Sequence, residues 1–172
     1  MNNQPHHRAQ LEEIARREML FRGFLPDFSD NVMSEIGLLT SPAGSQDNEI
    51  HDLRHLLWCS IDNDDSMDLD QLTAAEALDG NRTRVWVSIA DVDALVNRGS
   101  AVDAHALHNT TSIYTAAVIF PMLPEKLSTN LTSLNPDEDR VSMVVEMVIQ
   151  PDGMLEEGTV YRALVHNYAK LA

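Results

Sequence analysis

Five aspartates fall within nine residues of this sequence, a density of negative charge that few folds accommodate. Neighbouring carboxylates repel one another, and folding raises their local density further. A compact domain tolerates such a run when a cation lies among the carboxylates, and hard oxygen ligands favour Mg²⁺, Mn²⁺ or Ca²⁺. The run therefore predicts a divalent-metal site, and its members are Asp62, Asp64, Asp65, Asp68 and Asp70.

Acidic runs also occur commonly as solvated loops. Two features favour a folded site here. Residues 56–61 are apolar and strand-like, which places Asp62 at the end of a strand. Apolar side chains also occur within the run, at Ile61, Met67 and Leu69, which indicates that part of it is folded against a core. An EF-hand calcium loop is excluded, because its sixth and twelfth positions need glycine and glutamate and here hold Met67 and Thr73.

The length of 172 residues and the hydrophobic fraction of 44% are typical of one globular domain with a sizeable core. A single cysteine, Cys59, excludes an internal disulfide and a multi-cysteine zinc site. No apolar run reaches the length of a membrane span, and residues 1–10 lack the core of a signal peptide. We therefore expect a cytoplasmic protein without a membrane partner.

The charge balance is strongly acidic, with 27 aspartates and glutamates against 12 lysines and arginines and a net charge of −15. Proteins that bind nucleic acid usually present a basic face, because neutralising phosphate supplies most of their affinity. Two explanations stay open: either nucleic acid is not the partner, or the basic surface lies on polypeptide outside this sequence.

Residues 1–48 are predicted to form a helical extension and a linker, and residues 49–172 the main domain. The periodicity predicts an amphipathic helix over residues 8–22 that ends at Gly23. Residues 40–48 have the composition of a linker. The apolar side of the predicted helix carries Leu11, Ile14, Ala15 and Met19.

The main domain is predicted to contain a largely antiparallel sheet. Residues 84–89 and 141–149 alternate as half-buried strands do. A Pro-Asp-Gly turn leads from the second of these into a strand over about residues 158–168. Ser100 is placed to cap a short helix that ends near His108. These elements predict an α+β fold, a sheet with flanking helices.

A series of short motifs in fixed order resembles the front half of the catalytic domain of the ribonuclease II and ribonuclease R family, the RNB nucleases. The resemblance covers about residues 50–170. It implies a metal-dependent 3′→5′ exoribonuclease that hydrolyses single-stranded RNA to nucleoside 5′-monophosphates with Mg²⁺ or Mn²⁺. The motifs are Asp52-Leu53-Arg54, Ile61-Asp62, Asp68-Leu69-Asp70, Ile89-Ala90-Asp91-Val92, Gly99-Ser100 with Asp103, Thr111-Ser112-Ile113-Tyr114, Pro121-Met122-Leu123-Pro124 with Leu127-Ser128, and Ser133-Leu134-Asn135-Pro136 with Arg140.

The resemblance also implies the site residues. The family has four aspartates at the end of a narrow RNA channel, and Asp62, Asp68 and Asp70 match the first three. The position of the fourth holds Gln71, whose amide oxygen can bind a metal but brings no charge. Asp70 is predicted to bridge the metal and the attacking water. Tyr114 matches a tyrosine that stacks on a base near the RNA 3′ end, although packing in the core is an alternative for this ring.

Other candidate ligands are less specific. His51 and His55 lie four residues apart and His105 and His108 three apart, but neither pair has a third partner that would predict zinc. Asp91 follows a strand and is predicted either to orient ligands or, as is more common, to cap the next turn.

The family resemblance implies a partner as well as a substrate. The second half of the family's catalytic domain, with the arginines that hold the RNA backbone, is expected on a companion polypeptide. A different class of function also stays open: a catalytically inactive RNB-like module that binds RNA or protein, in which Gln71 marks the loss of activity. A third possibility is a domain that a metal stabilises and that has no role with nucleic acid.

Overall fold

The computed structural model describes residues 4–44 and 49–172. The chain forms two compact units, one made of residues 1–40 and 96–125 and the other of residues 41–95 and 126–172. We call them the helical unit and the sheet unit and describe each by itself. The boundary predicted near residue 48 lies in the segment 45–48, outside the described residues.

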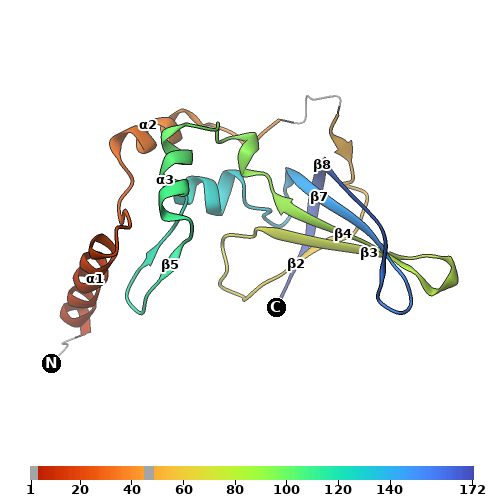
Figure 1. Ribbon diagram of the computed structural model, residues 1–172, viewed down its shortest axis with the longest axis horizontal. Coiled ribbons are helices and arrows are strands. Elements are labelled where there is room, and N and C mark those ends of the chain that lie inside the picture. The colour runs from red at the N-terminus through yellow and green to blue at the C-terminus, as the bar shows by residue number, and fades with distance from the viewer. Residues whose placement is uncertain (1–3, 45–48) are drawn as a thin grey trace. The chain divides into compact units, whose positions relative to one another are not determined.

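The sheet unit contains six strands, which confirms the α+β fold with a largely antiparallel sheet (Figure 1). Their order is β1-β8-β2-β3-β4-β7, and β7 also pairs with β8, so the sheet closes on itself. All neighbours are antiparallel except β1 with β8 and β2 with β8. The strands are β1 (His51–Asp52), β2 (Trp58–Ile61), β3 (Gln71–Ala77), β4 (Thr83–Ala90), β7 (Asp139–Ile149) and β8 (Leu155–Leu171).

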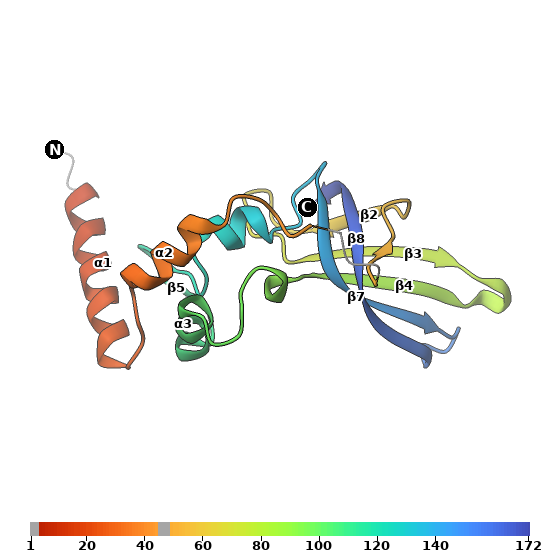
Figure 2. The ribbon, with the colours of Figure 1, turned by 90° about the horizontal axis from the view of Figure 1, so that it is seen from above.

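Closure of the sheet depends on the length of β8. Its first half pairs with β7 across a turn in which Gly153 has a φ of 86° and the Gln150 amide donates to the Met154 carbonyl. Its last residues pair in parallel with β2, where Ile61 lies opposite Leu171. Because β8 pairs with β7 and also with β2, residues near 60 and near 170 lie side by side (Figure 2).

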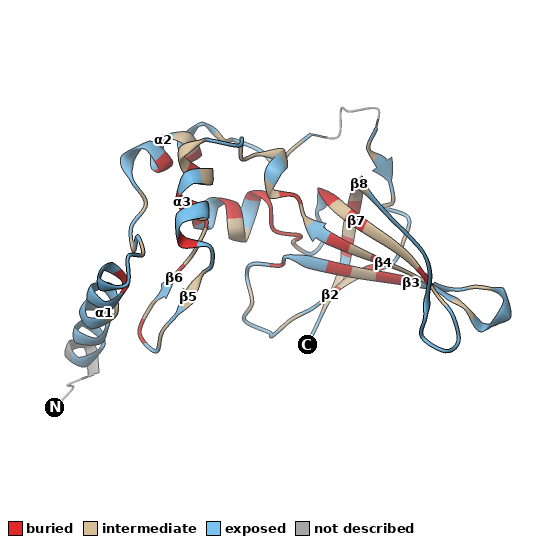
Figure 3. Cartoon of the chain, viewed as in Figure 1, coloured by how far each residue is buried: buried red, intermediate tan, exposed pale blue. Residues whose placement is uncertain are grey.

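The core lies on the inner side of the closed sheet. Trp58, Leu72, Trp86 and Val144 are buried there, and the buried parts of β3, β4 and β7 are visible in Figure 3. In β4 the buried positions are Trp86 and Ser88, whereas the other face of the strand stays half-buried or exposed. The inner face of this strand is therefore the one that carries the tryptophan and a serine.

The helical unit contains three helices and a hairpin of β5 (Ile113–Tyr114) with β6 (Ile119–Phe120). Helix α1 (Gln4–Phe21) confirms the predicted helix and ends where Gly23 has a φ of 83° and the Phe24 amide donates to the Met19 carbonyl. On the side predicted to be apolar, Met19 is buried but Leu11 and Ile14 are about half exposed.

Helices α2 (Asp30–Leu38) and α3 (Ala101–Asn109) pack together in the helical unit. Ser100 caps α3 as predicted, because its hydroxyl accepts a hydrogen bond from the Asp103 amide at 3.2 Å. The Glu35 carboxylate of α2 accepts from the Ala101 and Val102 amides at 2.8 and 3.0 Å, and these bonds lower its pKa. A carboxylate at a helix N-terminus satisfies amides that have no partner within the helix.

Short helical turns complete the sheet unit: η1 (Asp79–Asn81), η2 (Val92–Ala94) and η3 (Lys126–Leu131). Over the described part of the chain, none of the helices has both the length and the apolar character that crossing a membrane needs.

Candidate active site

The acidic loop, residues 62–70, connects β2 to β3 in the sheet unit. Its first residue is tied to the last strand, because the Asp62 amide donates to the Leu171 carbonyl at 2.9 Å. Its last residue is tied to β4, because the Ala90 amide donates to the Asp70 carbonyl at 2.9 Å. Both ends of the loop are thus fixed by backbone hydrogen bonds to strands of the closed sheet.

The second half of the loop is anchored in the core. The Leu69 side chain is 2% exposed, and its amide donates to the buried hydroxyl of Ser133 at 3.0 Å. The Leu69 carbonyl accepts from the Leu134 amide at 2.9 Å, and the Ser133 hydroxyl lies 3.2 Å from the Met67 carbonyl. The prediction that part of the run is folded against a core is confirmed at Leu69, whereas Ile61 and Met67 are 72% and 68% exposed.

The first half of the loop is held by a lysine from β8. The Lys170 ammonium donates to the carbonyl oxygens of Asp64 and Ser66 at 2.9 and 2.7 Å. Neither Lys170 nor Ser133 stood out as a loop anchor in the sequence. Each lies more than 60 residues from the loop atom it binds. For Lys170 the signal is the pairing of β8 with β2, which the sequence did not predict, whereas Ser133 lies in one of the family motifs without its contact with the loop being indicated.

Two of the aspartates predicted as metal ligands affect the pKa of the third. The pKa of Asp70 is raised, first because burial disfavours its charged form and then because the Asp68 and Asp62 carboxylates repel it. Asp62 is half-buried, whereas Asp68 and Asp70 are exposed, so the loop presents carboxylates to solvent from an anchored backbone. The surrounding atoms therefore shield Asp70 only in part, and solvent screens the repulsion among the three carboxylates. Gln71 is exposed as the first residue of β3, where it pairs with Ile89 of β4.

Among residues 4–44 and 49–172, no three side chains of His, Cys, Asp or Glu are arranged to hold a metal ion together. The donor set itself fits a divalent cation, because oxygen ligands with net negative charge are those that Mg²⁺ and Mn²⁺ prefer. The repulsion that raises the pKa of Asp70 is what a bound cation relieves. The fit is therefore one of chemistry and charge, with the loop backbone already anchored.

Tyr114 lies on β5 in the helical unit, with its side chain 67% exposed. Packing of this ring in the core, the alternative considered for it, is therefore wrong. Its role in stacking on RNA stays a prediction. An exposed aromatic face on a short hairpin is compatible with stacking on a base.

The other candidate ligands have structural roles. Asp91 is buried and caps η2 by accepting from the Ala94 amide at 3.2 Å, which confirms the capping role, and it also binds Arg162 at 2.7 Å. His105 packs on the Phe28 ring at 4.5 Å between centroids, and the His108 ring lies 2.6 Å from the Gly23 carbonyl.

His51 stacks on the Tyr161 ring at 4.6 Å between centroids. The Tyr161 hydroxyl donates to Glu146, and burial followed by this contact raises its pKa to about 12. Neither histidine pair is thus arranged around a metal in the described structure.

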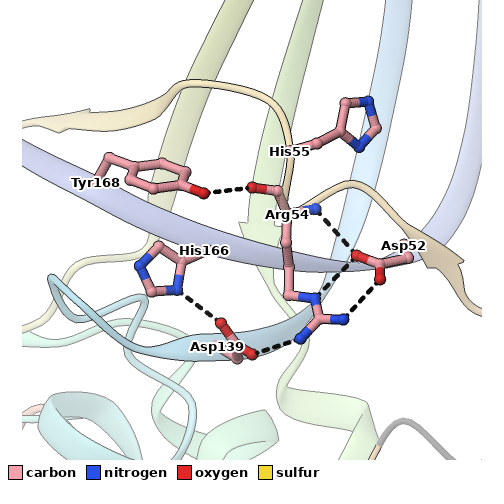
Figure 4. Close-up of a pocket in the computed structure, with 6 residues that line it drawn as sticks. All are labelled: Asp52, Arg54, His55, Asp139, His166 and Tyr168. Atoms are coloured by element: carbon pink, nitrogen blue, oxygen red, sulfur yellow. Dashed lines mark hydrogen bonds and ion pairs between the residues drawn. The ribbon is translucent and has the colours of Figure 1, made fainter.

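A second polar cluster of the sheet unit surrounds a pocket of about 480 Å³ (Figure 4). The Arg54 guanidinium binds Asp52 at 2.7 Å and Asp139 at 3.0 Å, and the His166 ring lies 2.6 Å from Asp139. The Tyr168 hydroxyl donates to the Arg54 carbonyl at 2.8 Å. The cluster explains the Asp52-Leu53-Arg54 motif, because Arg54 joins the segment after β1 to β7 and β8.

Both the sequence and the fold of this chain are similar to those of known proteins. The model of the RNB domain family matches residues 50–172. Ribonuclease R of Vibrio cholerae is 41% identical over 120 residues, which are 70% of this chain and 15% of that protein. Ribonuclease R of Thermotoga maritima is 32% identical over 148 residues, 84% of this chain and 21% of that protein.

Among solved structures, Mycoplasma genitalium RNase R in complex with ribose-methylated single-stranded RNA is similar with a TM-score of 0.82 and 30% identity. The match covers 89% of this chain and 24% of that one. The chain thus spans about a quarter or less of the length of the relatives it matches.

Proposed function

Because this chain belongs to the RNB domain family, as its motifs predicted, we propose that it carries the metal-binding part of a 3′→5′ exoribonuclease. The substrate proposed is single-stranded RNA and the products are nucleoside 5′-monophosphates. The observation that carries the proposal is the anchored acidic loop, in which Asp62 and Asp68 act on the charge of Asp70. A cation bound among these carboxylates would offset the repulsion between them.

In this proposal Asp62, Asp68 and Asp70 hold Mg²⁺ or Mn²⁺, and the Gln71 amide oxygen adds a neutral ligand. A divalent cation at this place lowers the pKa of a bound water and offsets the charge that develops on phosphate and leaving oxygen. Asp70 accepts a hydrogen bond from the attacking water and so orients it toward phosphorus. Because burial and two neighbouring carboxylates disfavour the charged form of Asp70, we expect a substitution at this position to reduce activity the most.

In this proposal Tyr114 explains why the chain accepts RNA of any sequence. Stacking on an aromatic face tolerates every base, which suits an enzyme that degrades RNA regardless of sequence. An exposed ring is available for such a contact without a rearrangement of the core.

The experiment that tests the proposal is digestion of 5′-labelled single-stranded RNA by the 172-residue chain, with Mg²⁺, with Mn²⁺ and with EDTA. We expect a ladder that shortens from the 3′ end, disappears with EDTA and is lost in Asp70→Asn. The matched control Asp79→Asn removes an exposed carboxylate of η1 instead and should cut as the unchanged chain does. Bound but uncut RNA in the presence of Mn²⁺, both with this chain alone and after addition of a polypeptide that carries the second half of the domain, would contradict catalysis and favour the inactive RNB-like module.

A further inference from the structure

The ammonium of Lys170 contacts the acidic loop through main-chain oxygens and not through a carboxylate. Lys170 is half-buried at the end of β8, and both oxygens it binds are main-chain carbonyls, those of Asp64 and Ser66. An ammonium surrounded by aspartates would be expected to pair with a carboxylate. Here it instead donates to two main-chain oxygens.

The two carbonyls belong to a tight turn. The Ser66 amide donates to the Asn63 carbonyl at 3.0 Å, so residues 63–66 reverse the chain direction. A lysine offers three N–H donors on a flexible stem, which lets one side chain bind two carbonyls of the same turn. Hydrogen bonds from a charged donor are stronger than neutral ones, so this side chain can fix the turn from a distant strand.

The same end of β8 also fixes the start of the loop. The Leu171 carbonyl accepts from the Asp62 amide at 2.9 Å, one residue after Lys170. The end of β8 therefore determines both where the loop leaves β2 and how it turns. Asp68 and Asp70 follow this turn along the chain, so the turn limits where the backbone that carries Asp68 can lie relative to Asp62.

We propose that Lys170 is a positioning residue: by fixing the turn at residues 63–66 it confines the acidic loop, so that Asp62, Asp68 and Asp70 need less rearrangement to converge on a divalent cation. The inference rests on the proposed function for the identity of the bound group. Two effects of Lys170 on metal affinity oppose each other: the fixed loop favours binding, whereas the positive charge repels the cation. Because the ammonium binds main-chain oxygens and the turn depends on it, the ordering effect is the larger.

The first test measures the loop without any metal, by hydrogen–deuterium exchange of the 172-residue chain. We expect Lys170→Met to speed exchange at residues 63–66 by about tenfold or more, because the variant loses both charge-assisted hydrogen bonds to the turn. Lys170→Arg should restore slow exchange. Arg98→Met, which removes one positive charge from an exposed side chain of the helical unit, is the control and should not change these amides. Equal exchange in Lys170→Met and the unchanged chain would overturn the proposal.

The amide of Trp86 in β4 reports whether the sheet is folded in each variant. If Lys170→Met also speeds exchange there, the comparison passes to Lys170→Gln, which keeps an N–H donor. Slow exchange at both Trp86 and residues 63–66 in Lys170→Gln would show that the charge is not needed for the turn and would contradict the role of a charged donor.

The second test is a Mn²⁺ titration followed by the loss of the free-ion electron paramagnetic resonance signal. We expect Lys170→Met to weaken Mn²⁺ binding about tenfold and Lys170→Arg to restore it. Equal or tighter binding in Lys170→Met would show that repulsion outweighs ordering and would refute the positioning role. If the unchanged chain binds no Mn²⁺, the proposed metal site is wrong, and the exchange experiment still decides whether Lys170 orders the loop.

Discussion

The Asp70 carboxylate is less favourable in its charged form here than in water, because burial and two neighbouring carboxylates oppose that charge. Metal binding and metal-free stability therefore make opposite demands on this residue. A ligand that repels its neighbours binds a cation well, and the same repulsion destabilises the metal-free fold. Substitutions at Asp70 and at its neighbour Gln71 separate these two effects.

Replacing Asp70 by Asn should stabilise the metal-free chain and abolish its stabilisation by metal. In EDTA we expect the melting temperature of Asp70→Asn to rise slightly above that of the unchanged chain, because solvent screens the repulsion at this exposed position. Adding Mg²⁺ should raise the melting temperature of the unchanged chain and not that of the variant. Differential scanning fluorimetry with and without EDTA checks both. A lower melting temperature of the variant in EDTA would contradict the repulsion.

Replacing Gln71 by Asp should have the reverse effect. A fourth carboxylate next to Asp70 adds repulsion in the metal-free chain and adds charge for the cation. We expect Gln71→Asp to lower the melting temperature in EDTA and to tighten Mn²⁺ binding by about tenfold. Gln71→Asn, which keeps the amide, is the matched control. Unchanged Mn²⁺ affinity in Gln71→Asp would show that this side chain does not face the cation.

At the scale of elements, the strands were predictable and their buried faces were not. Alternation correctly predicts strands at residues 84–89 and 141–149, which lie in β4 and β7. Both faces of these strands carry apolar residues, so the pattern alone does not tell which face points inward. That choice depends on closure of the sheet through β8, which is a long-range pairing.

Helix α2 was not predicted, for a related reason. It spans nine residues, and only Val32 and Ile36 are buried, so its periodicity is a single apolar pair. The Ser29 cap is the local signal that could have indicated it. In the same way spacing and family resemblance predict Asp62, Asp68 and Asp70 as the site, whereas the contacts of Lys170 and Ser133 with the loop depend on long-range packing that the sequence does not show.

Ser133 should contribute to stability through the loop amide that it satisfies. In Ser133→Ala the Leu69 amide stays buried and loses its acceptor, which costs about 1–3 kcal/mol of unfolding free energy. Urea denaturation measures this cost. Thr83→Ala, at an exposed position of β4, is the control and should change the unfolding free energy by less than about 0.5 kcal/mol. A cost for Ser133→Ala no larger than that of the control would contradict the anchoring role.

The cluster around Arg54 predicts loss of stability in acid. The pKa of Asp52 is lowered to about 2, mainly because the Arg54 side chain donates hydrogen bonds to it. The pKa of Asp139 is lowered, first by His166 and then by Arg54. Since both pKa values lie below their unfolded values near about 4, the folded state binds fewer protons there. The stabilisation is complete above about pH 4 and is lost as the pH falls toward 2.

Urea denaturation of the unchanged chain and of Asp52→Asn at several pH values between 2 and 6, about the range of these titrations, checks this effect. Asp52→Asn should be less stable than the unchanged chain at the upper end of the range, and the difference should shrink as the pH falls. A difference that stays constant over the range would show that Asp52 does not take part through its charge.

At the scale of the whole molecule, a net charge of −15 opposes RNA binding. The chain matches about a quarter or less of its relatives' length, and the companion polypeptide expected to supply a basic surface stays a prediction. Whatever else holds RNA, the property proposed for this chain itself is that its acidic loop binds a divalent cation.

Calorimetric titration of Mn²⁺ into the 172-residue chain tests that property most directly. We expect binding that Asp70→Asn weakens by about a hundredfold and that Asp79→Asn leaves unchanged. Equal affinity in the unchanged chain and Asp70→Asn, or no Mn²⁺ binding at millimolar concentrations, would contradict the assignment of the acidic loop as the metal site.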